Sequence, residues 1–147
     1  MNDANEQLVQ AAIAATHNAY APYSNFHVGA ALLLDDGKIV TGSNVENASY
    51  GMTLCAETVA IAKANSDGQM RRIVAIAVAG GPKSSEGGAV IGAEPITPCG
   101  RCRQVIKEVA DEVAIDLPVH CVHASGYETH LLSELLPHGF GPANLKS

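Results

Sequence analysis

Three cysteines and one glutamate are the side chains of this sequence best suited to metal-dependent chemistry. Cys55 and Glu57 lie in the tripeptide Cys55-Ala56-Glu57, and two further sulfurs follow in Pro98-Cys99-Gly100-Arg101-Cys102. Zinc is usually four-coordinate, so three thiolate ligands leave one position open for a water molecule. A carboxylate beside that position can accept and return protons. The pattern therefore predicts a hydrolytic site in which Cys55, Cys99 and Cys102 bind one zinc ion and Glu57 is catalytic.

The C-x-x-C pair alone also fits a redox dithiol or half of a structural zinc ribbon. The sequence has no second C-x-x-C to complete a ribbon, and a dithiol protein would give Cys55 and Glu57 no role. C-x-E followed by P-C-x-x-C is instead the pattern of zinc enzymes that deaminate nucleobases. The combined motifs favour deamination.

The composition is that of one domain, which we expect to cover residues 1–147. The apolar fraction of 47% is high and the charged fraction of 16% is low, which favours self-association. The net charge of -6 argues against a nucleic acid polymer as partner, because such proteins usually carry a basic surface. A small soluble substrate fits better.

The first residues, Met1 to Glu6, are polar and acidic, unlike a signal or transit peptide. No apolar run is long enough to span a bilayer, so we expect no membrane partner. We expect a cytoplasmic protein, whose cysteines stay reduced and available to a metal.

The elements that must position these residues follow from hydrophobic spacing. Two helices are expected to begin at the metal motifs, one over residues 53–65 and one over residues 100–112. Their positive N-terminal ends would favour thiolates at the site. The other expected elements are a helix over 5–20, a hairpin of strands 28–34 and 38–41, strands 73–79 and 119–122, and a helix over 131–136.

This alternation of strands and crossover helices predicts a three-layer α/β domain with a mixed sheet. The glycine-rich residues 80–92 are expected to form a loop, either over the substrate or on the surface. Cys121 is expected in the core. His120 and His123 are expected at the surface or at polar interfaces rather than in a second metal site.

Several segments together resemble the small homotetrameric cytidine deaminases of nucleoside salvage. The similarity covers the run from Tyr20 to Phe26, the block Asn44-Val45-Glu46-Asn47-Ala48-Ser49-Tyr50-Gly51, both metal motifs and the C-terminal region to Phe140. It implies a three-layer α-β-α sandwich with a mixed five-stranded sheet. It also implies hydrolytic deamination of cytidine and deoxycytidine to uridine and deoxyuridine, one zinc ion per subunit, and a homotetramer with shared active sites.

The resemblance further implies a substrate-binding set: Phe26, Asn44, Glu46, Ala56, Tyr50 and Phe140. Phe26 is expected to pack against the pyrimidine ring, while Asn44 and Glu46 hydrogen-bond the sugar hydroxyls. Tyr50 and Phe140 are expected near the site of a neighbouring subunit.

Thr58 departs from the family pattern, because many tetrameric members have arginine directly after the Cys-Ala-Glu motif. Zinc with three thiolates has a formal charge of about -1, which opposes ionisation of a bound water. The helix N-termini, together with Arg101 or Arg103, are the expected sources of compensating positive charge.

Three alternatives stay open on the sequence. One is a deaminase of the same fold that acts on another aminopyrimidine nucleoside, such as a nucleoside antibiotic. Another is a catalytically silent, zinc-stapled oligomeric binding module. A polynucleotide deaminase is disfavoured, because it would need a basic groove.

Overall fold

The computed structural model describes residues 3–146, and Met1 and Asn2 of the acidic N-terminal stretch lie outside this range. No helix among the described residues is both long and apolar enough to cross a membrane. The main elements are α1 (Ala4–Ala15), β1 (Phe26–Leu34), β2 (Ile39–Ser43), α2 (Ala56–Ser66), β3 (Ile73–Pro82), α3 (Gly100–Val113), β4 (Pro118–His123), β5 (Gly126–Leu131) and α4 (Leu132–Leu135).

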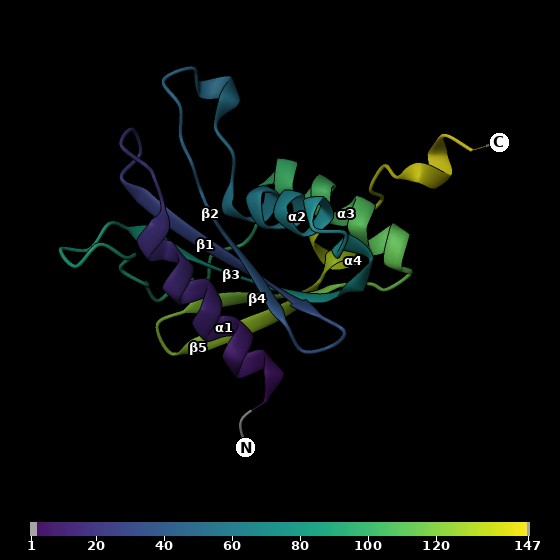
Figure 1. Cartoon of the computed structure of the whole chain (residues 1–147), viewed down its shortest axis with the longest axis horizontal. Coiled ribbons are helices and arrows are strands. Elements are labelled where there is room, and N and C mark those ends of the chain that lie inside the picture. The colour runs from purple at the N-terminus through teal and green to yellow at the C-terminus, as the bar shows by residue number, and fades with distance from the viewer. Residues whose placement is uncertain (1–2, 147) are drawn as a thin grey trace.

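The five strands form one mixed sheet in the order β2-β1-β3-β4-β5. β3 and β4 are parallel, and the other neighbouring pairs are antiparallel. The parallel pair requires a crossover, which α3 supplies. Figure 1 shows α1 on one face of the sheet, with α2 and α3 on the other. The expected three-layer sandwich and mixed sheet are therefore confirmed.

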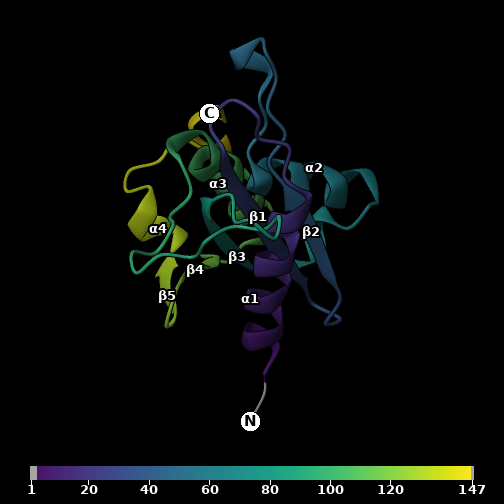
Figure 2. The ribbon, with the colours of Figure 1, turned by 90° about the vertical axis from the view of Figure 1, so that its left-hand side faces the viewer.

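Alternating side chains of β1 separate the two cores. Ala30 and Leu32 pack with α2 and α3, whereas Ala31 packs against α1 together with Ala75 and Ala77 of β3. The residues that face α1 are mostly alanine, which allows that helix to lie close to the strands. Figure 2 shows α1 beside β1 and β3, with α2 beside β2.

Gly42 of β2 allows α2 to lie directly on the sheet. A Cβ atom at Gly42 would lie 2.5 Å from the Ala60 nitrogen and 2.6 Å from the Ala56 oxygen, both backbone atoms of α2. No side chain fits in that space. This contact fixes the start of α2, and hence Cys55 and Glu57, beside the end of β2.

The structure corrects several boundaries expected from the sequence. The first helix ends at Ala15 and continues only as a 3-10 turn to Asn18, and β3 extends to Pro82, into the expected glycine-rich loop. Beyond β3, a bridge between Lys83 and Ala89 closes the loop into a turn. The hydrophobic spacing of the sequence did not predict β5. The short last helix begins at Leu132, one residue later than expected.

Candidate active site

The N-termini of α2 and α3 lie close together at the two metal motifs, as the sequence predicted. Cys55 is the N-cap of α2 and Cys99 is the N-cap of α3, and neither side chain caps its own helix. Their sulfurs are therefore free to face a ligand. Cys102 lies in the first turn of α3 and is fully buried.

The three sulfurs have a geometry that fits zinc. Cys55 Sγ and Cys99 Sγ lie 3.7 Å apart, and all three ligand atoms lie within 4.8 Å of one another. Tetrahedral Zn–S bonds of about 2.3 Å place two sulfurs roughly 3.8 Å apart. All four cysteines are free of disulfides, so the thiols are available.

Glu57 is buried beside this cluster, with 4% of its surface exposed. Burial raises the pKa of its carboxyl above the usual value. A carboxylate with a raised pKa holds a proton more readily, which suits a group that accepts and returns one near neutral pH.

The cysteines strongly influence one another's ionisation. Interaction between the Cys55 and Cys102 side chains lowers the pKa of Cys55 and raises that of Cys102, and burial raises the latter further. A divalent cation favours the thiolate form of such ligands. The donor set is therefore chemically suited to zinc.

A cavity of about 330 Å³ lies over Cys55 and Glu57. Four of the expected substrate-binding residues line it: Phe26, Asn44, Glu46 and Ala56. Cys99 also lines the cavity, whereas Cys102 lies behind the wall. A larger hollow of about 520 Å³ beside α3 and α4 has none of these residues in its wall.

Asn44 and Glu46 are held in place by the backbone around the cavity. Asn44 Oδ1 accepts a hydrogen bond from the Val28 nitrogen at 2.9 Å, and Asn44 Nδ2 donates to the Phe26 oxygen at 2.9 Å. Glu46 accepts hydrogen bonds from the Tyr23 and Ser24 nitrogens and from the Ser24 hydroxyl. Partial desolvation raises the pKa of Glu46, but these hydrogen bonds outweigh it and hold the value below normal. Glu46 is therefore an ionised acceptor.

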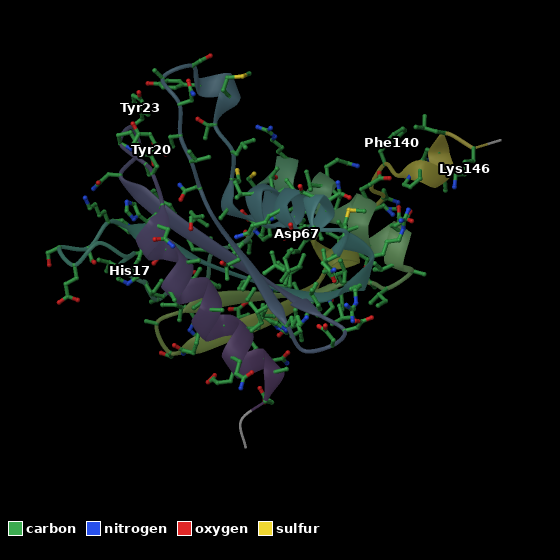
Figure 3. All side chains as sticks on the ribbon, in the orientation of Figure 1. His17, Tyr20, Tyr23, Asp67, Phe140 and Lys146 are labelled. Atoms are coloured by element: carbon green, nitrogen blue, oxygen red, sulfur yellow. The ribbon has the colours of Figure 1, made fainter. Side chains whose placement is uncertain are left out.

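Tyr50 and Phe140 do not line this cavity. Tyr50 is 74% exposed, contacts Tyr23 edge-on at 5.9 Å between ring centroids, and lines an adjacent hollow. Phe140 is 57% exposed on the C-terminal segment, on the opposite side of the molecule from Tyr23 (Figure 3). The structure thus groups Tyr50 with the site region but separates Phe140 from it within one chain.

The two arginines beside the metal motif bind oxygen rather than sulfur. Arg101 Nη1 donates to the Thr53 oxygen at 3.2 Å. Arg103 donates to three oxygens, those of Pro98 and Leu135 and the Thr97 hydroxyl. The hydrogen bonds of both arginines in the described structure therefore go to oxygen atoms and not to a ligand sulfur. Thr58 Oγ1 instead lies 3.4 Å from Cys102 Sγ.

Six further cavity residues were absent from the expected set: Ser24, Val28, Thr53, Leu54, Ile96 and Thr97. Ile96 and Thr97 lie just before the Pro-Cys motif in a segment without periodicity, so only their nearness to Cys99 in the sequence indicated a role. Arg103 donates hydrogen bonds to the Thr97 hydroxyl and the Pro98 oxygen and so holds this segment in place.

Cys121 is buried, as expected, and burial raises the pKa of its thiol to about 11. The surface or interface role expected for His120 needs correction, because only 3% of it is exposed. Its Nδ1 lies 2.8 Å from the Thr129 hydroxyl and its ring contacts Tyr127 edge-on. β5 pairs with β4 at His120 and α1 contacts β4, and the hydrophobic pattern of the sequence did not predict β5.

Comparisons with known proteins agree with this geometry. The model of the cytidine and deoxycytidylate deaminase zinc-binding region matches residues 2–115. A cytidine deaminase of Halalkalibacterium halodurans is 44% identical over 136 residues, which cover 92% of this chain and 92% of that protein. A cytidine deaminase of Mycobacterium tuberculosis is 45% identical over 128 residues, covering 86% of this chain and 82% of that protein.

Solved structures are similar over the same length. The crystal structure of cytidine deaminase from Burkholderia pseudomallei has a TM-score of 0.78 and 42% identity, and the match covers 95% of this chain and 100% of that one. The cytidine deaminase of Mycobacterium tuberculosis has a TM-score of 0.70 and 38% identity, over 95% of this chain and 99% of that one.

Proposed function

The chain belongs to the family defined by the cytidine and deoxycytidylate deaminase zinc-binding region, and from this membership we propose an active site built on Cys55, Cys99, Cys102 and Glu57. The protein is an enzyme that catalyses the zinc-dependent hydrolytic deamination of cytidine. The observation that supports the proposed site most directly is the position of Glu57. Glu57 is buried and lines the same cavity as Cys55, Cys99 and the aromatic ring of Phe26.

In the proposed site the three cysteines hold zinc and Glu57 carries protons. When bound, zinc supplies Lewis-acid activation that lets water act as a nucleophile near neutral pH. Glu57 accepts a proton from the attacking water and gives it to the ring nitrogen, which makes the amine-bearing carbon more electrophilic. Water adds to that carbon, and Glu57 takes the second proton from the new hydroxyl group and gives it to the exocyclic amine, so that a C=O bond forms as the C–N bond breaks and ammonia leaves. Water and cytidine are thereby converted to uridine and ammonia.

The remaining cavity residues orient the nucleoside. Phe26 offers an aromatic face to the pyrimidine ring, and Ala56, between a ligand and the acid, leaves room for the base. Asn44 retains a second N–H, and Glu46 has lone pairs that can accept from sugar hydroxyls. Both groups can still hydrogen-bond the remaining hydroxyls of a sugar that lacks the 2′-hydroxyl, so we propose deoxycytidine as a second substrate.

We also propose that residues 1–147 form one catalytic domain that assembles as a homotetramer with shared active sites. All four main helices contact the single sheet, which supports one domain. Large apolar side chains are exposed at Tyr50, Met52 and Phe140, and assembly would remove such surface from water. We propose a cytoplasmic location, which the four free thiols support.

The activity is tested by following the loss of cytidine absorbance and the release of ammonia by the zinc-loaded protein. Cytidine, deoxycytidine and an aminopyrimidine nucleoside antibiotic are compared under the same conditions. We expect turnover of the first two. Turnover of the antibiotic alone would establish a different substrate class, and no turnover by a fully zinc-loaded protein would establish a silent binding module.

A further inference from the structure

Thr58 lies in the first turn of α2 and reaches across to α3. Its hydroxyl Oγ1 is 3.4 Å from the sulfur of Cys102, a residue with no exposed surface. We propose that Thr58 is a positioning residue for the metal centre, whose hydroxyl donates a hydrogen bond to the Cys102 thiolate and thereby tunes the metal. This inference rests on the proposed ligand set.

The charge of the site creates the need for such a donor. Three thiolates around a divalent ion leave a formal charge of about -1, and buried Glu57 lies beside them. Arg101 and Arg103 direct their recorded hydrogen bonds to oxygen atoms. The Thr58 hydroxyl lies within hydrogen-bond distance of the Cys102 sulfur, and Glu57 also interacts with Cys102 but brings a carboxylate rather than a neutral donor.

The direction of the hydrogen bond follows from the surroundings. A threonine in a helix often donates to the carbonyl four residues earlier, which here belongs to Leu54. That oxygen already accepts from the Val45 nitrogen at 3.0 Å, and the structure records no hydrogen bond from Thr58 to it. A thiolate has no hydrogen and can only accept. The Thr58 hydroxyl is therefore the donor.

Such a hydrogen bond withdraws electron density from one of three ligands. A less electron-rich sulfur donates less charge to the metal, so the metal becomes a stronger Lewis acid. Thr58→Val has nearly the same shape without the donor, and Thr58→Ser keeps the donor without the methyl group. The pair separates hydrogen bonding from packing.

The test uses cobalt(II) as a spectroscopic probe in the full-length protein. The thiolate-to-cobalt charge-transfer band is recorded for wild type, Thr58→Val and Thr58→Ser at matched metal content. We expect the valine variant to shift this band to longer wavelength and the serine variant to keep the wild-type position. In the zinc-loaded proteins, the valine variant is expected to lower kcat about tenfold with little change in KM.

A wild-type thiolate band that Thr58→Val leaves unmoved would overturn this inference alone. A wild-type cobalt protein without any thiolate band would overturn the ligand assignment and this inference with it. Unfolding midpoints of the three proteins are measured in parallel. A purely structural role would change the midpoint of the valine variant but not its band position.

Discussion

At the residue scale, Asn44 and Glu46 both face the substrate cavity and hold its wall together. Asn44 bonds the backbone of β1 at Phe26 and Val28, while Glu46 bonds the loop at Tyr23 and Ser24. The side chains proposed to hydrogen-bond the sugar are therefore held in position before the substrate binds. Preorganised groups bind more tightly, because less conformational freedom is lost on binding.

Substitution should distinguish the two residues. Glu46→Gln is expected to raise KM for cytidine roughly tenfold or more, because a charged acceptor is lost. Asn44→Ala is expected to raise KM and also to lower the free energy of unfolding by about 1–3 kcal/mol, because the Val28 nitrogen and Phe26 oxygen lose their partner. Steady-state kinetics and urea unfolding measure both effects. Glu86→Gln, an exposed change in the loop after β3, is the control, and an unchanged KM for Glu46→Gln would contradict the proposed sugar contact.

His120 should make the fold sensitive to acid. Burial lowers its pKa, so the folded state holds a neutral ring where the unfolded chain, with a pKa of about 6.5, binds a proton. Its contribution to stability is present above pH 6.5 and is lost as pH falls from there toward the folded-state pKa. The expected slope in that window is at most about 1.4 kcal/mol per pH unit.

Urea unfolding between pH 5.5 and 7.5 measures this effect, with His120→Gln as the matched variant. The difference in slope between the two proteins isolates His120 from zinc loss, which affects both. Parallel stability profiles for wild type and variant would contradict this prediction.

At the element scale, the start of α2 depends on its contact with β2. Gly42 permits that contact, and the helix then places Cys55 at its N-cap and Glu57 in its first turn. α3 meets the same site from the other side with Cys99 at its N-cap. The spacing of the proposed zinc ligands is thus set by how two helices pack on one sheet.

Gly42→Ala tests that dependence. The new Cβ would lie 2.5–2.6 Å from backbone atoms of α2, so the helix must shift. We expect a loss of about 1–3 kcal/mol in the free energy of unfolding, with lower zinc content and turnover. Gly92→Ala is the control, because no atom lies within 4 Å of its added Cβ. Equal zinc content and stability in the two variants would show that the close approach has no part in building the site.

The metal motifs and the start of α3 could be predicted from the sequence because ligand spacing and helix periodicity are local signals, whereas α2 begins at Ala56 and not at residue 53 as expected. β5 could not, because Gly126–Leu131 is a short edge strand whose place depends on pairing with β4. The burial of His120 was hidden for the same reason. The Thr58 contact with Cys102 also depends on the relative positions of two helices, which no local pattern contains.

At the scale of the whole molecule, the cavity of a single chain is not lined by all of the expected site residues. Phe26, Asn44 and Glu57 line one cavity, whereas Phe140 lies on a separate part of the surface. In a closed symmetric assembly, a residue exposed on one subunit can complete the site of the next. The proposed homotetramer would give Phe140 that role.

Mixing an impaired variant with an inactive one tests the shared site. Phe140→Ala should impair the neighbouring site, and Glu57→Gln should inactivate its own. Subunits unfolded together and reassembled at equal amounts should regain activity, because some sites then combine an intact Glu57 with an intact neighbouring Phe140. Activity no higher than the average of the two separate variants, or a monomeric mass in solution at active concentrations, would contradict the shared site.

The most direct test of the central claim is cytidine turnover by wild type and Glu57→Gln at measured zinc content. The glutamine side chain keeps the size of Glu57 but cannot accept and return a proton. We predict one zinc ion per chain in both proteins, turnover by the wild type, and a loss of at least about a hundredfold in kcat for the variant. Wild-type turnover by zinc-loaded Glu57→Gln would contradict the account.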